Sequence, residues 1–320
     1  MFKSWFGRKP PPRPERQLAL ATDTSLPRPP EGPRLPIAYR GPALILTTKV
    51  DDITPSELKN AIRRRIPDMD LDSPTPIDSK KLAQHPTVLG FYPEPVKASQ
   101  SGRTPLLCGV RYTPEVNLED MAQRSFVTSC WWWPETREVV ARTKAHALTV
   151  MLGDVDKTPP KERILVELQL AAAALDVLKT ATAVVWPDAN AMWKPDDFRR
   201  DLEQAEGEIP ITLTVAVKIG EDTEHVRPDG TPKWFAMTEG LNALGIMEVE
   251  WRAFDSDVSN LAPWLLGIAQ YLVTNGPIVG DGDSMGSAVP GTMPPVFVRH
   301  EPSTTVLGTQ AYVVYPQSPN

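Results

Sequence analysis

The sequence is poor in cysteine and has no long apolar run. Its two cysteines, Cys108 and Cys130, are too few for a disulfide scaffold and lack the paired spacing of a zinc site. No stretch approaches the ~20 continuous apolar residues that a membrane helix requires. The start, MFKSWFGRK, has no apolar core of the kind found in secretory signals. We therefore expect a cytoplasmic protein without stable membrane insertion.

Signatures of nucleotide and metal chemistry are also lacking. Neither a Walker loop nor the pattern G-x-G-x-x-G occurs, and both patterns mark phosphate-binding turns. The histidines do not show the H-E-x-x-H spacing of a zinc protease helix; they are His85, His146, His225 and His300. No cofactor is predicted, and the sequence favours a non-catalytic protein over an enzyme.

Acidic residues outnumber basic ones outside the N-terminal segment. The formal net charge is −6, so the chain has no overall basic footprint for nucleic acid. Residues 1–40 hold nine of the 35 prolines and a charge of +5 (eight basic, three acidic), which leaves −11 on residues 41–320. This composition predicts a disordered basic tail at residues 1–40. A proline-rich ligand at residues 11–14 and weak attraction of the first residues to an anionic membrane remain alternatives.

The chain beyond this tail has the pattern of an α+β fold. We expect two packed subdomains, residues 41–206 and 207–320, with mostly antiparallel sheets covered by helices and a ferredoxin-like tendency. The strict alternation of apolar and other residues over 211–219 is the clearest strand signal. Strands are also predicted at 43–50, 88–92, 106–112, 145–152, 183–186, 234–237, 247–252, 296–299 and 311–315. Helices are predicted at 55–66, 117–126, from 133 onward, 160–180, 195–205 and 261–274.

Three features of the C-terminal half belong together: residues 238–241 followed by Gly245, the strand at 247–251, and Asp281-Gly282-Asp283-Ser284-Met285-Gly286. By these features the C-terminal half resembles the bacterial domain-of-unknown-function 4261 family. Residues 132–135 and 145–148 resemble longer members of the family, so that the likeness runs from about residue 41 to 315. The resemblance implies no activity, cofactor or substrate.

The loop Asp281–Gly286 is the most suggestive local motif. Two carboxylates two residues apart, freed by glycines, suit Ca²⁺ or Mg²⁺. Met285 and Thr292 occupy positions where an EF-hand loop needs ligands, which excludes that motif. The alternative is a tight turn in which the carboxylates of Asp281 and Asp283 accept backbone N–H groups. We favour the turn, and we predict Gly240, Gly282 and Gly286 to be structural turn glycines.

The triplet Trp131, Trp132 and Trp133 is the second candidate site. Side chains alternate in an extended segment, so at least one indole should be exposed and able to anchor a partner. Core packing at the entry to a helix is the alternative. Trp131 and Trp132 are predicted binding residues.

Together these observations predict a non-catalytic cytoplasmic protein that binds another protein. A regulatory, a secretion-accessory and an immunity-type role all fit, and the oligomeric state stays open. The rival hypothesis is a metal-assisted hydrolase built from Asp281, Asp283 and His300, because His300 ends a predicted strand that the acidic loop could approach.

Overall fold

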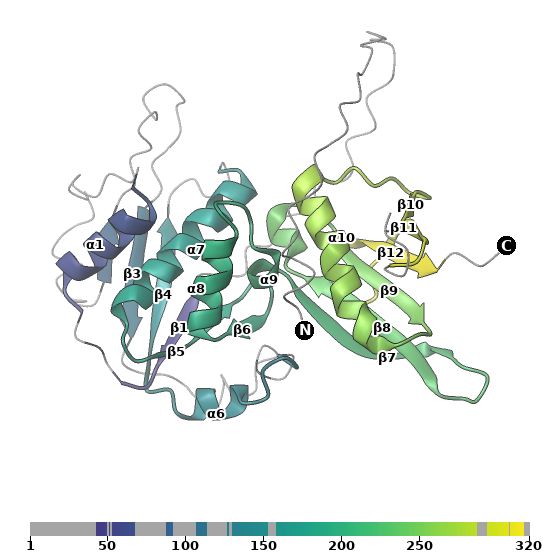
Figure 1. Ribbon diagram of the computed structural model, residues 1–320, viewed down its shortest axis with the longest axis horizontal. Helices are drawn as coiled ribbons and strands as arrows, with labels where there is room; N and C mark the ends of the chain where they lie inside the picture. The colour runs from purple at the N-terminus through teal and green to yellow at the C-terminus, as the bar shows by residue number, and fades with distance from the viewer. Residues whose placement is uncertain are drawn as a thin grey trace, which may run out of the picture. The chain divides into compact units, whose positions relative to one another are not determined.

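The computed structural model describes residues 43–49, 51, 53–67, 88–91, 107–113, 127, 130–152, 158–286, 293–306 and 308–316. Within them the chain forms two six-stranded sheets and the helices that pack on them (Figure 1). The predicted α+β class with mostly antiparallel sheets is confirmed. The tail predicted at 1–40 and the helix predicted at 117–126 lie outside the described residues. The predicted boundary between residues 206 and 207 stays a prediction.

The first sheet is antiparallel throughout, in the order β2-β3-β4-β1-β5-β6. Helices α1, α7 and α8 pack together on it, with α7 against β4, β3 and β1 and α8 against β5. The strands are β1 (Leu44–Thr47), β2 (Val88–Phe91), β3 (Leu107–Thr113), β4 (Ala145–Leu152), β5 (Ala181–Trp186) and β6 (Ala191–Trp193). The helices of this part are α1 (Pro55–Arg65), α6 (Thr136–Ala141), α7 (Pro160–Val177) and α8 (Pro195–Gln204).

Helix α1 begins where the sequence places its start signal. The Thr54 hydroxyl accepts the Glu57 N–H at 3.2 Å, and the Glu57 carboxylate accepts the Thr54 N–H at 2.9 Å. This reciprocal capping satisfies two backbone donors at the helix start. The apolar stripe then buries Leu58 and Ile62, while Ile66 lies half-buried after the last turn. Local capping and four-residue spacing are enough to specify this helix.

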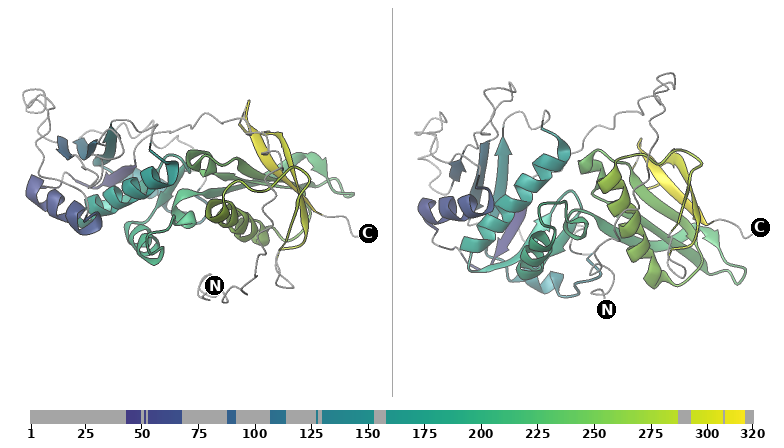
Figure 2. Two further views of the ribbon diagram at one scale, coloured as in Figure 1. Left: turned by 90° about the horizontal axis from the view of Figure 1, so that it is seen from above. Right: turned by 45° about the horizontal axis from the view of Figure 1, so that its top comes forward.

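The second sheet has the order β10-β11-β12-β9-β8-β7 and is antiparallel except for the parallel pair β12–β9. Helix α10 (Leu261–Asn275) packs against β7, β8 and β9 (Figures 1 and 2). It ends at Gly276, whose positive φ of 88° is a backbone conformation that glycine adopts without the strain of a side chain. The other elements are α9 (Ile211–Thr214), β7 (Ala216–Val226), β8 (Pro232–Glu239), η3 (Leu241–Leu244), β9 (Glu248–Phe254), η4 (Val258–Asn260), β10 (Ser284–Met285), β11 (Val296–Pro302) and β12 (Gln310–Pro316).

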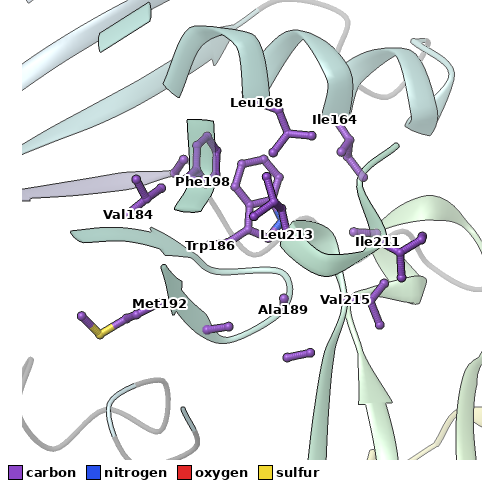
Figure 3. Close-up of a cluster of buried hydrophobic side chains, with 14 of the residues drawn as sticks. Ile164, Leu168, Val184, Trp186, Ala189, Met192, Phe198, Ile211, Leu213 and Val215 are labelled. Atoms are coloured by element: carbon purple, nitrogen blue, oxygen red, sulfur yellow. The ribbon is translucent and has the colours of Figure 1, made fainter. Parts of the chain in front are cut away.

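The strand predicted at 211–219 is wrong over its first five residues. Residues 211–214 form the helical turn α9, in which the Thr214 N–H and hydroxyl both donate to the Pro210 carbonyl. Only from Ala216 does the chain become strand β7, which then extends to Val226. Leu213 is fully buried in the same cluster as Trp186 and Phe198 (Figure 3). Tertiary packing thus places these alternating apolar residues in a corner rather than in a continuous strand.

Candidate functional site

Trp131 is the most exposed of the described aromatic side chains that the sequence marked as candidates. The residue is 52% exposed, yet its indole N–H donates to the carbonyl of Val217 on β7 at 3.1 Å. The preceding Cys130 is buried beside β6, where its sulfur accepts the Met192 N–H at 3.1 Å. Burial raises the pKa of the Cys130 thiol, which disfavours the reactive thiolate. Trp131 is therefore an exposed ring with a fixed position.

The other tryptophans of this segment turn progressively inward. The rings of Trp131 and Trp132 meet edge to face with centroids 5.8 Å apart, and Trp132 stacks on Trp193 of β6 at 4.9 Å. Trp133 is buried, with the Lys194 ammonium 5.5 Å from its ring centroid. We call Trp131, Trp132 and Trp193 together the Trp131 surface. One ring of the triplet is exposed, one is half-buried and one packs in the core. That Trp131 and Trp132 bind a partner stays a prediction.

A polar group of three residues fixes the chain next to this surface. The Lys218 ammonium on β7 donates to the carbonyl of Asn190 at 2.8 Å and lies 3.8 Å from the Glu239 carboxylate. The Asn190 side-chain amide donates to that carboxylate at 3.4 Å. These contacts join the turn before β6 to β7 and β8. They thus tie the chain before β6 to β7, the strand whose Val217 carbonyl accepts the Trp131 indole N–H.

The loop Asp281–Gly286 uses its carboxylates as turn acceptors. Asp283 accepts the Gly280 N–H at 2.7 Å, and Asp281 accepts the backbone N–H of His300 at 2.9 Å. Gly282 has a φ of 87° and donates its N–H to the Val298 carbonyl. This left-handed backbone is what glycine tolerates best.

The structure does not bring the three residues of the hydrolase hypothesis together as a metal site. Asp281 contacts the backbone of His300, whereas the His300 ring places Nε2 3.0 Å from the Val279 carbonyl and packs against Tyr312. No group of three or more histidine, cysteine or acidic residues within the described ranges is arranged to hold a metal ion.

Residues 282–286 also match G-x-S-x-G, a pattern that the sequence reasoning missed. In hydrolases the serine of this pattern stands on a turn from a strand into a helix. Here Ser284 instead begins the short strand β10 and pairs with Phe297 of β11. His300 lies three residues farther along β11, about 10 Å away at strand spacing. The pattern is therefore present without the geometry of a nucleophile.

We expect Asp283→Ala to lower the free energy of unfolding by about 1 kcal/mol, because the exposed turn loses one acceptor. Asp283→Asn should lower the free energy of unfolding by less, since an amide oxygen can still accept the Gly280 N–H. Urea unfolding of both variants checks the order. Ca²⁺ or Mg²⁺ should not change the melting temperature of wild type or of either variant. If wild type instead binds a stoichiometric ion that Asp283→Asn does not bind, the loop is an ion site and not only a structural turn.

Two buried carboxylates on β9 were not predicted. Glu248 is buried; it accepts the N–H groups of Gly240 and Asn242 at 2.9 and 3.0 Å and the Thr238 hydroxyl at 2.7 Å. Burial raises the pKa of Glu248 to about 7, against the effect of these hydrogen bonds. The carboxyl holds the turn between β8 and η3.

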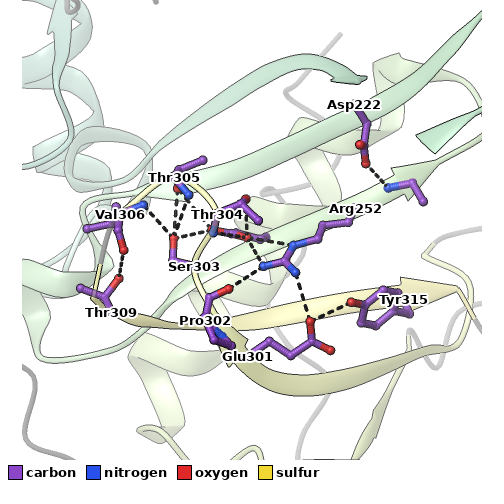
Figure 4. A network of polar contacts seen from close by, with 12 residues as sticks. Asp222, Arg252, Glu301, Pro302, Ser303, Thr304, Thr305, Val306, Thr309 and Tyr315 are labelled. Atoms are coloured by element: carbon purple, nitrogen blue, oxygen red, sulfur yellow. Dashed lines mark hydrogen bonds and ion pairs between the residues drawn. The ribbon is translucent and has the colours of Figure 1, made fainter. Parts of the chain in front are cut away.

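Glu250, two residues further along β9, binds a whole loop. Its carboxylate accepts the Ser303 hydroxyl at 2.6 Å and pairs with the Arg252 guanidinium at 2.7 Å. Arg252 also contacts Glu301, which accepts the Tyr315 hydroxyl (Figure 4). Further donors to Glu250 are the Thr304 N–H and the hydroxyls of Thr304 and Thr305. The alternating polar residues of β9 thus anchor the chain that leads into β12.

Part of the chain that holds these carboxylates matches a known protein family. Residues 237–303 match the family described as Domain of unknown function (DUF4261). The resemblance predicted from the sequence is confirmed for this part of the chain. The DUF4261 match runs from the end of β8 to Ser303 and includes Glu248, Glu250, α10 and the Asp281–Gly286 turn. No curated protein and no solved structure matches the chain.

The DUF4261 match does not reach the Trp131 surface, which lies earlier in the sequence. Strand β7, whose Val217 carbonyl fixes the Trp131 ring, also precedes it. Among the described residues, no helix combines the length and apolar character needed to cross a bilayer.

Proposed function

We propose that this protein is a non-catalytic cytoplasmic binding protein that docks another protein on its Trp131 surface. The observation that carries the proposal is the fixed exposure of Trp131: half of the residue faces solvent while its indole N–H is held by Val217. Tryptophan is enriched among the residues that dominate protein interfaces. A ring already held in place loses little conformational freedom on binding.

The charge of the chain supports a protein partner over nucleic acid. Residues 41–320 carry a net −11, which repels phosphate backbones. The hydrolase rival has no such support, because Asp281 and Asp283 are each engaged by a backbone N–H. We therefore put forward the binding function alone.

The test is quantitative capture of partners from the source cells on wild-type and variant protein. Trp131→Ala should weaken binding of the partner by about 2 kcal/mol, roughly thirtyfold in Kd, with little change in stability because the ring is exposed. Trp131→Phe keeps an aromatic ring without the anchoring N–H and should give an intermediate loss.

Tyr271→Ala is the matched control, because Tyr271 on α10 is another exposed aromatic side chain, at 44%. It should leave binding unchanged. Calorimetry with the purified partner then gives each Kd. Equal capture by wild type and Trp131→Ala would reject the proposal, and loss with Tyr271→Ala alone would move the binding surface to α10.

A further inference from the structure

The outer edge of β7 lies directly beside Trp131. β7 is the last strand of the second sheet, and β8 pairs with it on one side only. In an antiparallel pair, alternate residues direct their N–H and C=O groups away from the neighbour. The Val217 carbonyl points outward, because it accepts the Trp131 indole N–H. By the same alternation, the backbone groups of Ile219 and Glu221 also face outward.

This edge is open for a short length. Among the described residues, the backbone of Ile219 and Glu221 has no hydrogen-bond partner outside the β7–β8 ladder. The open length ends at an irregularity in register between Asp222 and Val226. There the buried Asp222 carboxylate accepts the Ala253 N–H at 2.8 Å. Ile219 and Glu221 can therefore each offer one N–H and one C=O to a strand that pairs with this edge.

The charges along this edge indicate what kind of strand fits. Glu221 and Glu224 are exposed, whereas the nearby Lys218 is engaged by Asn190 and Glu239. An incoming segment with lysine or arginine is therefore complementary. A second copy of β7 is disfavoured, since a two-fold antiparallel pairing about Glu221 would set like charges opposite each other.

We propose that β7 accepts a strand from the partner: an extended segment bearing lysine or arginine pairs with Ile219 and Glu221, and its end contacts Trp131. The inference rests on the proposed function and specifies its binding mode. Backbone hydrogen bonds supply part of the affinity in strand addition, and side chains at alternate positions supply specificity.

The test selects twelve-residue peptides from a random display library on the full-length protein and measures their Kd by fluorescence anisotropy. The variant Glu221→Pro removes one outward N–H and adds a ring at the edge, yet leaves the β7–β8 ladder intact, because proline is tolerated where the N–H faces solvent. Glu221→Gln is its matched control, since it removes the charge and keeps the N–H. Circular dichroism verifies that both fold.

We expect the selected peptides to alternate apolar and basic residues. Glu221→Pro should weaken them at least tenfold, and Glu221→Gln only a few-fold. Binding should also slow hydrogen exchange across residues 217–224, and methylation of alternate peptide nitrogens should abolish it. Failure to select any such peptide, equal binding to Glu221→Pro, or unchanged exchange would overturn strand addition.

Two further outcomes separate this inference from the proposed function. If Trp131→Ala weakens binding while Glu221→Pro does not, the Trp131 surface binds a partner without strand addition, and the inference fails alone. If neither variant weakens binding, both fail. Self-association of the unliganded protein that Glu221→Pro abolishes would show that a second copy occupies the edge and would also overturn the inference.

Discussion

Gly240→Ala is expected to lower the free energy of unfolding by about 3 kcal/mol or more. Gly240 has a φ of 127°, where an L side chain is strained. An ideal Cβ at this position would overlap the carbonyl oxygen of Thr214 and lie 3.1 Å from its carbonyl carbon. Both of those atoms belong to the backbone of α9, so relief requires the corner before β7 to move.

The damage from Gly240→Ala should extend beyond the turn itself. The Gly240 N–H donates to buried Glu248, and η3, which comes next in the chain, accepts the Arg163 guanidinium of α7 through the Ala243 carbonyl at 3.0 Å. A shift of this turn therefore disturbs contacts with the helix that covers the first sheet.

Gly267→Ala is the matched control for Gly240→Ala. Gly267 lies within α10, and no heavy atom comes within 4 Å of its ideal Cβ. Alanine there should raise stability by about 0.5–1 kcal/mol, because glycine is a poor helix residue. Urea unfolding of both variants measures the contrast. A Gly240→Ala protein as stable as wild type would mean that the α9 corner yields at little cost.

Local signals in the sequence account for the elements that were predicted well. The capping box at Thr54 and Glu57 and the glycine at position 276 each act within one helical turn, so neighbours in sequence suffice to specify them. Strand β4 coincides with the predicted range 145–152. In these cases, pattern and packing favour the same structure.

The errors and omissions come from long-range packing. Apolar alternation over 211–219 is compatible with a strand, but burial of Leu213 against the first sheet's core requires a corner at α9.

The Glu248 and Glu250 positions look like the solvent side of a half-buried strand. Glu248 binds Gly240 across a turn, and Glu250 binds Ser303, which is 53 residues away in sequence. No local pattern therefore reveals that these two carboxylates are buried. The G-x-S-x-G match at 282–286 shows the converse case: the local pattern is present, but the strand-to-helix turn that makes its serine a nucleophile is not.

The exposed position of Trp131 could be predicted only in outline. Alternation indicated that at least one ring of the triplet faces solvent, and Trp131 and Trp132 were both singled out, but only Trp131 is exposed. The choice depends on the Val217 carbonyl, which is 86 residues away in sequence, and on Trp193, which covers Trp132. Which indole is available to a partner is therefore decided by how β6 and β7 are placed.

Glu250→Gln should destabilise the protein by about 3 kcal/mol, since it removes the buried charge that pairs with Arg252 and turns an amide donor toward the donors of Ser303 and Thr304. Arg252 keeps its ion pair with Glu301, so its charge is not left alone. Glu250 is completely buried, and its partner Arg252 is largely so. Glu301→Gln is the matched control: Glu301 also contacts Arg252, at 3.1 Å, but it is a third exposed. Its loss should cost about 1 kcal/mol or less.

The pH dependence of stability tests the same network. Burial acts to raise the pKa of Glu250, but the hydrogen bonds from Ser303 and Arg252 outweigh it, so that the pKa lies below its ordinary 4.5. The unfolded chain therefore binds the proton more tightly, and the stabilisation is present above pH 4.5 and lost as the pH falls below it. The stability difference between wild type and Glu250→Gln, measured by urea unfolding from pH 7 down to pH 3, should shrink in that acid range. A difference that is small at pH 7, or that grows as the pH falls, would show that the Glu250 carboxylate does not hold the loop by its charge.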